Sequence, residues 1–205
     1  GLPISLGLHP WYVNEPWSEI AAVVLRERPT AVGECGLDGE DRDPNIPPLE
    51  SQRSVFEQQL DLAEQLSLPV TVHSRKAVND VVELAAHFPR VRGVLHAFSG
   101  SLEQIRPLLE RGWMVGVGGA VTRPGARRIR KLATQVDLSM LLLETDAPAI
   151  GLEGVRPPLV RPHHLLAVAR ALAELRGLDT EEVASITDAN ARRMFGDSAL
   201  IPLAV

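Results

Sequence analysis

The chain has 205 residues, of which 45% are apolar and 23% charged, and its formal net charge is -5. This composition is typical of a globular protein with a sizeable core and excludes a disordered tail, so we expect one domain spanning residues 1–205. Because the net charge is negative, the chain as a whole does not attract nucleic acid. Any contact with a polyanion has to come from a local basic patch or from a bound metal ion.

The sequence also bears on the compartment. The single cysteine, Cys35, excludes an internal disulfide and favours a reducing environment. The first residues have no basic segment followed by an apolar one, and no apolar run is long enough to span a bilayer. We expect a cytoplasmic protein without membrane contact.

Apolar runs alternate with helical patterns along the chain. In order, they are an apolar run at 3–11, a helix at 19–28, a run at 31–38, a helix at 49–66, a run at 69–75, a helix at 79–87, a run at 91–100, a helix at 101–111, a run at 113–121, a basic helix near 123–131, a run at 140–148, and helices at 162–176 and 180–195. Ser101 and Gln104 form a capping-box signature, and Asn190 is expected to tie down the last helix.

This alternation predicts βαβ units and a parallel sheet with right-handed connections, an α/β fold of the TIM-barrel type. Six strands are expected, whereas a closed (β/α)8 barrel needs eight strands and typically about 250 residues. The predicted barrel is therefore incomplete by about two βα units. Its open strand edges favour self-association or contact with another segment.

Four of the apolar runs end in residues that bind metals: Glu34, His73, His96 and Asp146. Parallel α/β folds place their chemistry at the carboxyl ends of the strands, so these side chains are expected to meet. A buried carboxylate needs a positive partner, and imidazoles with carboxylates are ligands of divalent ions. The pattern indicates a metal-dependent hydrolase.

Each residue taken alone has a plainer interpretation. Glu34 alone would suit a salt bridge to an Arg, and a single histidine is more often structural than a ligand. Asp146 and Asp38 both suit turns, although Asp38 would also suit a role in supporting a ligand. Cys35 is expected to face away from Glu34 and pack in the core. The metal site is favoured because four strands end alike.

Six motifs in this order resemble the TatD-type deoxyribonuclease family: GLHP (7–10), AVGECGLD (31–38), PVTVHSR (69–75), LHAFSG (95–100), ETDAP (144–148) and ANARRMF (189–195). The resemblance implies a TIM barrel in which Glu34 bridges two metals and His73 and His96 complete one site. It also implies that Asp146 binds the other metal and handles the attacking water.

The sequence departs from the family at one point. Members carry a His-x-His pair on the first strand, which supplies two ligands to the second metal, and none occurs here. His163 and His164 are adjacent and lie in a Pro-rich segment, so they are poor substitutes. Since GLPISLGLHP corresponds to the third barrel strand by chain order, the sequence resembles a member without its first two strands, and one metal site is expected to be incomplete.

The expected activity is hydrolysis of phosphodiester bonds in DNA with up to two divalent ions, Mg²⁺, Mn²⁺ or Zn²⁺. Glu34 and Asp146 are the expected catalytic residues, and His9, Arg75 and Arg123 the expected substrate contacts. The basic stretch from Arg123 to Lys131 suits a phosphate backbone, although such stretches are usually solvated helix faces. Two alternatives remain: hydrolysis of a small amide, lactone or ester, and an inactive remnant that binds a partner.

Overall fold

The computed structural model describes residues 3–40 and 43–196, which form a parallel sheet covered by helices. The strands are β1 (Ser5–Leu6), β2 (Ala31–Asp38), β3 (Val70–Arg75), β4 (Gly93–Leu95), β5 (Met114–Val117) and β6 (Leu141–Leu143). Each strand pairs in parallel with the next in sequence. The predicted TIM-barrel-like fold with six strands is confirmed. Within the described ranges no pairing joins β6 to β1, so the sheet stays open.

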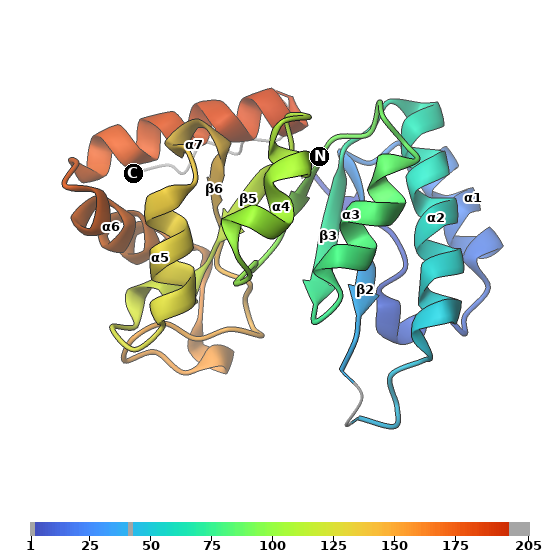
Figure 1. Ribbon diagram of the computed structural model, residues 1–205, viewed down its shortest axis with the longest axis horizontal. Coiled ribbons are helices and arrows are strands. Elements are labelled where there is room, and N and C mark those ends of the chain that lie inside the picture. Colours follow the sequence, from blue (N-terminus) through green and yellow to red (C-terminus); the bar gives the residue numbers. More distant parts are fainter. Residues whose placement is uncertain (1–2, 41–42, 197–205) are drawn as a thin grey trace.

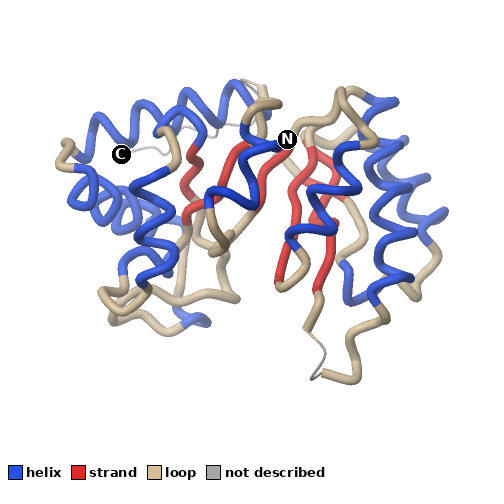
Figure 2. The backbone as a smooth tube through the Cα atoms, in the orientation of Figure 1, coloured by secondary structure: helices blue, strands red, loops and turns tan. Residues whose placement is uncertain are grey.

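The helices are α1 (Trp17–Glu27), α2 (Leu49–Leu66), α3 (Val78–Ala86), α4 (Leu102–Leu109), α5 (Arg127–Gln135), α6 (Leu165–Arg176) and α7 (Thr180–Phe195). They surround the strands, which lie inside the molecule (Figure 2). Every predicted helix is present, but the one expected at 162–176 begins with a 3-10 turn, Pro162–His164, before α6. Among the described helices, none has both the length and the apolar character needed to cross a bilayer.

A capping box marks the start of α4, and a side-chain amide holds the last helix in place. Ser101 accepts a hydrogen bond from the Gln104 backbone N–H, and the Gln104 side chain accepts one from the Ser101 N–H, so the predicted capping box of α4 is confirmed. The Asn190 amide of α7 donates to the carbonyls of Leu138 and Leu141, both at 2.8 Å. These bonds fasten α7 to the start of β6, as the sequence predicts.

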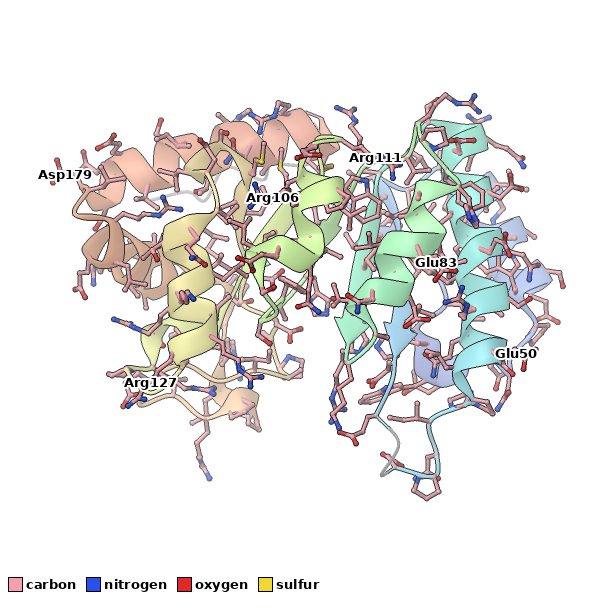
Figure 3. The ribbon with its side chains drawn as sticks, viewed as in Figure 1. Glu50, Glu83, Arg106, Arg111, Arg127 and Asp179 are labelled. Carbon is pink, nitrogen blue, oxygen red and sulfur yellow. The ribbon has the colours of Figure 1, made fainter. Side chains whose placement is uncertain are left out.

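The main core lies between the sheet and its helices. It includes Phe56, Leu95, Trp113 and Leu141, all at most 1% exposed. Cys35 belongs to this core, which confirms its predicted packing role. A smaller cluster on the other side of β4 to β6 packs against α7; its members are Val94, Met114, Leu142 and Met194. The exposed charges Glu50, Glu83 and Arg127 lie on helices α2, α3 and α5 (Figure 3).

The carboxyl ends of the strands define the functional edge of the molecule. In Figure 1 the arrowheads of β2 and β3 point to the lower edge, where the segment after β6 also lies, and α7 runs along the opposite edge. Because every strand pair is parallel, the residues at the end of each strand are brought to that same edge.

Candidate metal centre

A cavity of about 790 Å³ opens at the carboxyl ends of the strands. The four predicted ligands all line it, namely Glu34 from β2, His73 from β3, His96 directly after β4 and Asp146 after β6. His9, which follows β1, lines it as well. Side chains separated by as many as 137 positions in the sequence therefore share one site, as the parallel topology requires.

Glu34 reaches the cavity through an irregularity in β2. The register of β2 against β3 shifts between Val32 and Cys35, and Glu34 is the one residue of the strand that is not fully buried. Gly33 and Gly36 flank it with φ angles of 148° and 121°. A Cβ on Gly33 would lie 2.0 Å from the Thr71 hydroxyl, so only glycine fits there. A bulge of this kind re-aims a side chain, here toward the cavity.

Three imidazoles converge on one oxygen of Glu34. Its Oε1 lies 2.8 Å from His96 Nε2, 3.0 Å from His73 Nδ1 and 3.5 Å from His9 Nε2. Burial alone would raise the pKa of Glu34, but the hydrogen bonds from these imidazoles hold it far below its ordinary value. The half-buried carboxylate therefore has three imidazoles as hydrogen-bond partners.

The pKa of His96 moves in the opposite direction. Burial alone would lower it, but the hydrogen bond to Glu34 and the negative charges of Glu144, Glu34 and Asp146 raise the pKa of His96 to about 9. The surroundings of this imidazole therefore favour positive charge, which either a proton or a cation supplies.

In His73 and His96, one ring nitrogen faces Glu34 and the other faces a different carboxylate. His73 Nε2 lies 3.0 Å from the Asp38 carboxylate, and the second nitrogen of His96, Nδ1, lies 3.8 Å from Glu144. A proton shared with Asp38 leaves the His73 nitrogen that faces Glu34 with a lone pair for a metal. At 3.8 Å, Glu144 is beyond hydrogen-bond distance of His96 and acts on it as a nearby negative charge.

His9 is arranged the other way round. The Trp11 backbone N–H donates to its Nδ1 at 3.2 Å, so the ring proton lies on Nε2 and points at Glu34. The ligand atoms of His9, Glu34 and His73 do lie within 4.8 Å of one another. The Nε2 proton makes His9 a hydrogen-bond donor to Glu34, whereas His73 has a second carboxylate, Asp38, on the side that faces away from Glu34.

Asp38 is buried at the end of β2 and is 1% exposed. Its carboxylate accepts hydrogen bonds from the Trp11 indole at 2.8 Å and the Glu40 backbone N–H at 3.0 Å, in addition to the bond with His73. Burial alone would raise the pKa of Asp38, but these hydrogen bonds lower it. Gln52 of α2 fixes the Asp38 backbone by bonding both its N–H and its carbonyl. The supporting role considered for Asp38 thus has a structural basis.

Glu144 is a functional candidate that the sequence reasoning missed. Its Oε1 accepts a hydrogen bond from the Ala97 backbone N–H at 2.5 Å, and burial raises its pKa to about 7. The side chain lies over Gly116 of β5, where a Cβ would come within 2.4 Å of Glu144 Oε2. The strand at 113–121 carries no metal-binding side chain, but its Gly116 makes room for Glu144, which directly follows β6. The Gly-x-Gly of this strand, Gly116 and Gly118 on one face, is the signal that was available.

Asp146 borders the cavity in a tight turn. Its φ is 49°, and its carbonyl accepts hydrogen bonds from the N–H groups of Ala149 and Ile150. Burial and the negative charge of Glu34 raise the pKa of its carboxyl, against the opposing effect of His96 and His73. Asp146 therefore both forms a turn and lines the cavity, the two positions that the sequence suggests for it.

Three cations line the cavity: Arg75, Lys76 and Arg128. Arg75 and Lys76 each pair with Glu40, at 2.8 and 2.9 Å. Arg128 is exposed and makes no hydrogen bond or ion pair with any residue that the structure describes.

Arg123, one of the expected substrate contacts, lies away from the cavity. Its guanidinium donates to the Gly151 carbonyl, which ties it to the loop after β6. Its role in substrate binding stays a prediction. Arg123 precedes α5, whereas Arg128 lies on the helix and reaches the cavity.

The donor set fits a divalent ion. It combines the imidazole nitrogens of His73 and His96 with the carboxylate of Glu34, and the carboxylates of Asp146 and Glu144 lie nearby. Nitrogen and oxygen ligands of this type suit Zn²⁺ and Mn²⁺. With ordinary side-chain adjustments, Glu34, His73 and His96 are able to hold one ion and Asp146 to contribute to it or to a second.

Known proteins are similar to this chain in sequence and in fold. Residues 2–196 match the family described as TatD related DNase. The chain is 38% identical to the uncharacterized metal-dependent hydrolase YjjV of Escherichia coli K12, over 93% of this chain and 75% of the relative. It is 36% identical to a protein of Erwinia tasmaniensis named 3'-5' ssDNA/RNA exonuclease TatD, and the match covers 93% of this chain and 77% of that protein. The crystal structure of YjjV superposes on this chain with a TM-score of 0.85 at 35% identity, and the superposition covers 95% of this chain and 76% of the YjjV chain. The chain belongs to the TatD family of metal-dependent hydrolases.

Proposed function

We propose that this protein hydrolyses phosphodiester bonds in DNA, using a divalent ion held by Glu34, His73 and His96. The observation that carries the proposal is the meeting of two imidazoles, His96 and His73, at one oxygen of Glu34, 2.8 and 3.0 Å away. Mg²⁺, Mn²⁺ and Zn²⁺ are the candidate ions. A second ion would share Glu34 and bind Asp146.

Such an ion, when bound, lowers the pKa of a water molecule and polarises the phosphoryl oxygen. Asp146 is the proposed base that orients this water and accepts its proton, because its raised pKa brings the carboxyl closer to neutral pH. His9 donates to Glu34 and so keeps the carboxylate oriented. Glu144 places a negative charge beside His96, on the side that faces away from Glu34.

The cations on the cavity wall favour an anionic substrate. We propose that Arg128, which has no partner among the described residues, binds a phosphate of the strand, and that Arg75 contributes a second cation on the wall of the same cavity. Relatives named 3'-5' ssDNA/RNA exonucleases support a nucleic acid as the substrate.

The assignment is tested with purified protein, each of the three metals and a labelled DNA strand. Glu34→Gln and Asp146→Asn are expected to abolish cleavage, and Glu50→Gln on the surface of α2 is the matched control. Cleavage that persists in both site variants would refute the assignment. Metal-dependent turnover of a small ester or amide with intact DNA would favour a different hydrolase.

The phosphate contact has its own test. Arg128→Ala is expected to weaken strand binding and to reduce the slope of log K against log salt by about 0.7, the value for one single-strand phosphate contact. Arg127→Ala, its exposed neighbour outside the cavity, is the control and should leave the slope unchanged. Equal slopes in wild type and Arg128→Ala would exclude the contact.

A further inference from the structure

Two exposed aromatic side chains lie next to the candidate metal centre. The sequence contains three Trp, one Tyr and four Phe. Among the described residues only Trp11 and Tyr12 of this group are exposed, at 42% and 59%. Both belong to the 3-10 turn Pro10–Tyr12 that follows His9, and Trp11 lines the cavity. An apolar ring in water beside a polar site calls for an explanation.

Trp11 is held in a fixed position. Its indole N–H donates to the buried Asp38 carboxylate at 2.8 Å, and its backbone N–H donates to His9. The indole stands edge-to-face with the His9 ring at 5.0 Å and with the His73 ring at 6.4 Å. The ring is therefore rigid and immediately adjacent to two imidazoles of the site.

The bond to Asp38 does not by itself account for this residue. An amide side chain would also donate a hydrogen bond to the carboxylate, and it would expose far less apolar surface. What distinguishes Trp11 is a large, rigid aromatic surface at the cavity wall. Surfaces of this kind bind the faces of nucleic acid bases, and they occur together with cations that bind the backbone. Here the same cavity carries Arg128 and Arg75.

We propose that Trp11 is a stacking platform for a base of the substrate. The inference rests on the proposed function and adds a residue that contacts the substrate. Stacking on Trp11 requires a base face that is free, and bases within a duplex already stack on both neighbours. Tyr12, beside Trp11 in the same turn, offers a second ring to a longer strand.

Two substitutions separate stacking from support of Asp38. Trp11→Phe keeps an aromatic face but loses the N–H, whereas Trp11→Gln keeps an N–H donor but loses the ring. Both are made in the full-length chain carrying Asp146→Asn, so that the strand is not cleaved. The dissociation constant is measured with Mn²⁺ by fluorescence anisotropy, for a thymidine strand, for an abasic strand of equal length, and for a blunt duplex.

Trp11→Gln is expected to weaken binding of the thymidine strand roughly 5- to 150-fold, the range for loss of one base stack. Binding of the abasic strand and of the duplex should not change, and Trp11→Phe should keep most of the affinity for the thymidine strand. Equal losses on the thymidine and abasic strands, or a greater loss with Phe than with Gln, would overturn the proposal and leave Trp11 as a support for Asp38.

Cleavage by the chain with native Asp146 is measured separately. If no strand is cleaved but the Trp11-dependent preference for bases is present, the phosphodiesterase assignment fails and the stacking platform stands. If DNA is cleaved and the preference is absent, the stacking platform fails and the assignment stands.

Discussion

Replacing Asp38 by Asn is expected to weaken metal binding without unfolding the protein. Asp38 accepts from three donors, the Trp11 indole, the Glu40 N–H and His73 Nε2. An asparagine keeps one side-chain oxygen and replaces the other by an NH2 group, which donates. At least one of the three N–H groups that bond to Asp38 would then point at this NH2 group. A buried unmatched donor costs about 1–3 kcal/mol. Loss of the partner of a metal-bound imidazole typically lowers metal affinity about 10- to 100-fold, equivalent to about 1.4–2.8 kcal/mol.

The measurement is a calorimetric titration of the metal-free protein with Zn²⁺ or Mn²⁺, accompanied by a thermal melt to establish that the variant is folded. Asp80→Asn is the matched control, because Asp80 lines the same cavity but pairs with Arg53 and contacts no imidazole of the site. If a folded Asp38→Asn protein binds the metal within about twofold of wild type, the reasoning about His73 is wrong.

Three further predictions concern packing and charge. Gly116→Ala is expected to displace Glu144, to lower the free energy of unfolding by about 1–3 kcal/mol in denaturant titrations, and to reduce DNA cleavage. Gly125→Ala is the control, because an added Cβ there meets nothing within 4 Å, and it should change neither the free energy of unfolding nor cleavage. With a chelator present, the free energy of unfolding should fall as pH rises from about 5 to 9. The folded-state pKa values, about 7 for Glu144 and about 9 for His96, exceed the ordinary values of 4.5 and 6.5, so the folded protein holds these protons more tightly than the unfolded chain. Glu144→Gln should flatten the part of this fall below pH 7 in denaturant titrations, and an unchanged slope would contradict the assignment of that pKa. Asn190→Ala removes two buried hydrogen bonds and should lower the melting temperature while leaving metal affinity unchanged; a parallel loss of metal affinity would contradict its purely structural role.

The order and type of the strands and helices followed from the sequence because apolar runs and helical periods alternate regularly. The α2 and α7 ranges agree with the prediction at both ends. The convergence of Glu34, His73 and His96 also followed, since parallel strands all deliver their carboxyl ends to one edge.

What the sequence did not disclose depends on contacts between distant segments. The room for Glu144 is created by a glycine on the neighbouring strand, and the proton of His9 is placed by the backbone N–H of Trp11. The choice between Arg123 and Arg128 depends on which of the two extends toward the cavity. Periodicity and motif spacing carry no information about such contacts.

The most direct test is an anomalous difference map from crystals of this chain grown with Mn²⁺ or Zn²⁺. We expect a peak bound by Glu34, His73 Nδ1 and His96 Nε2, with His9 hydrogen-bonded to Glu34 but not ligating. A peak that excludes His96, or one found only at another group of residues such as His163 and His164, would contradict this account.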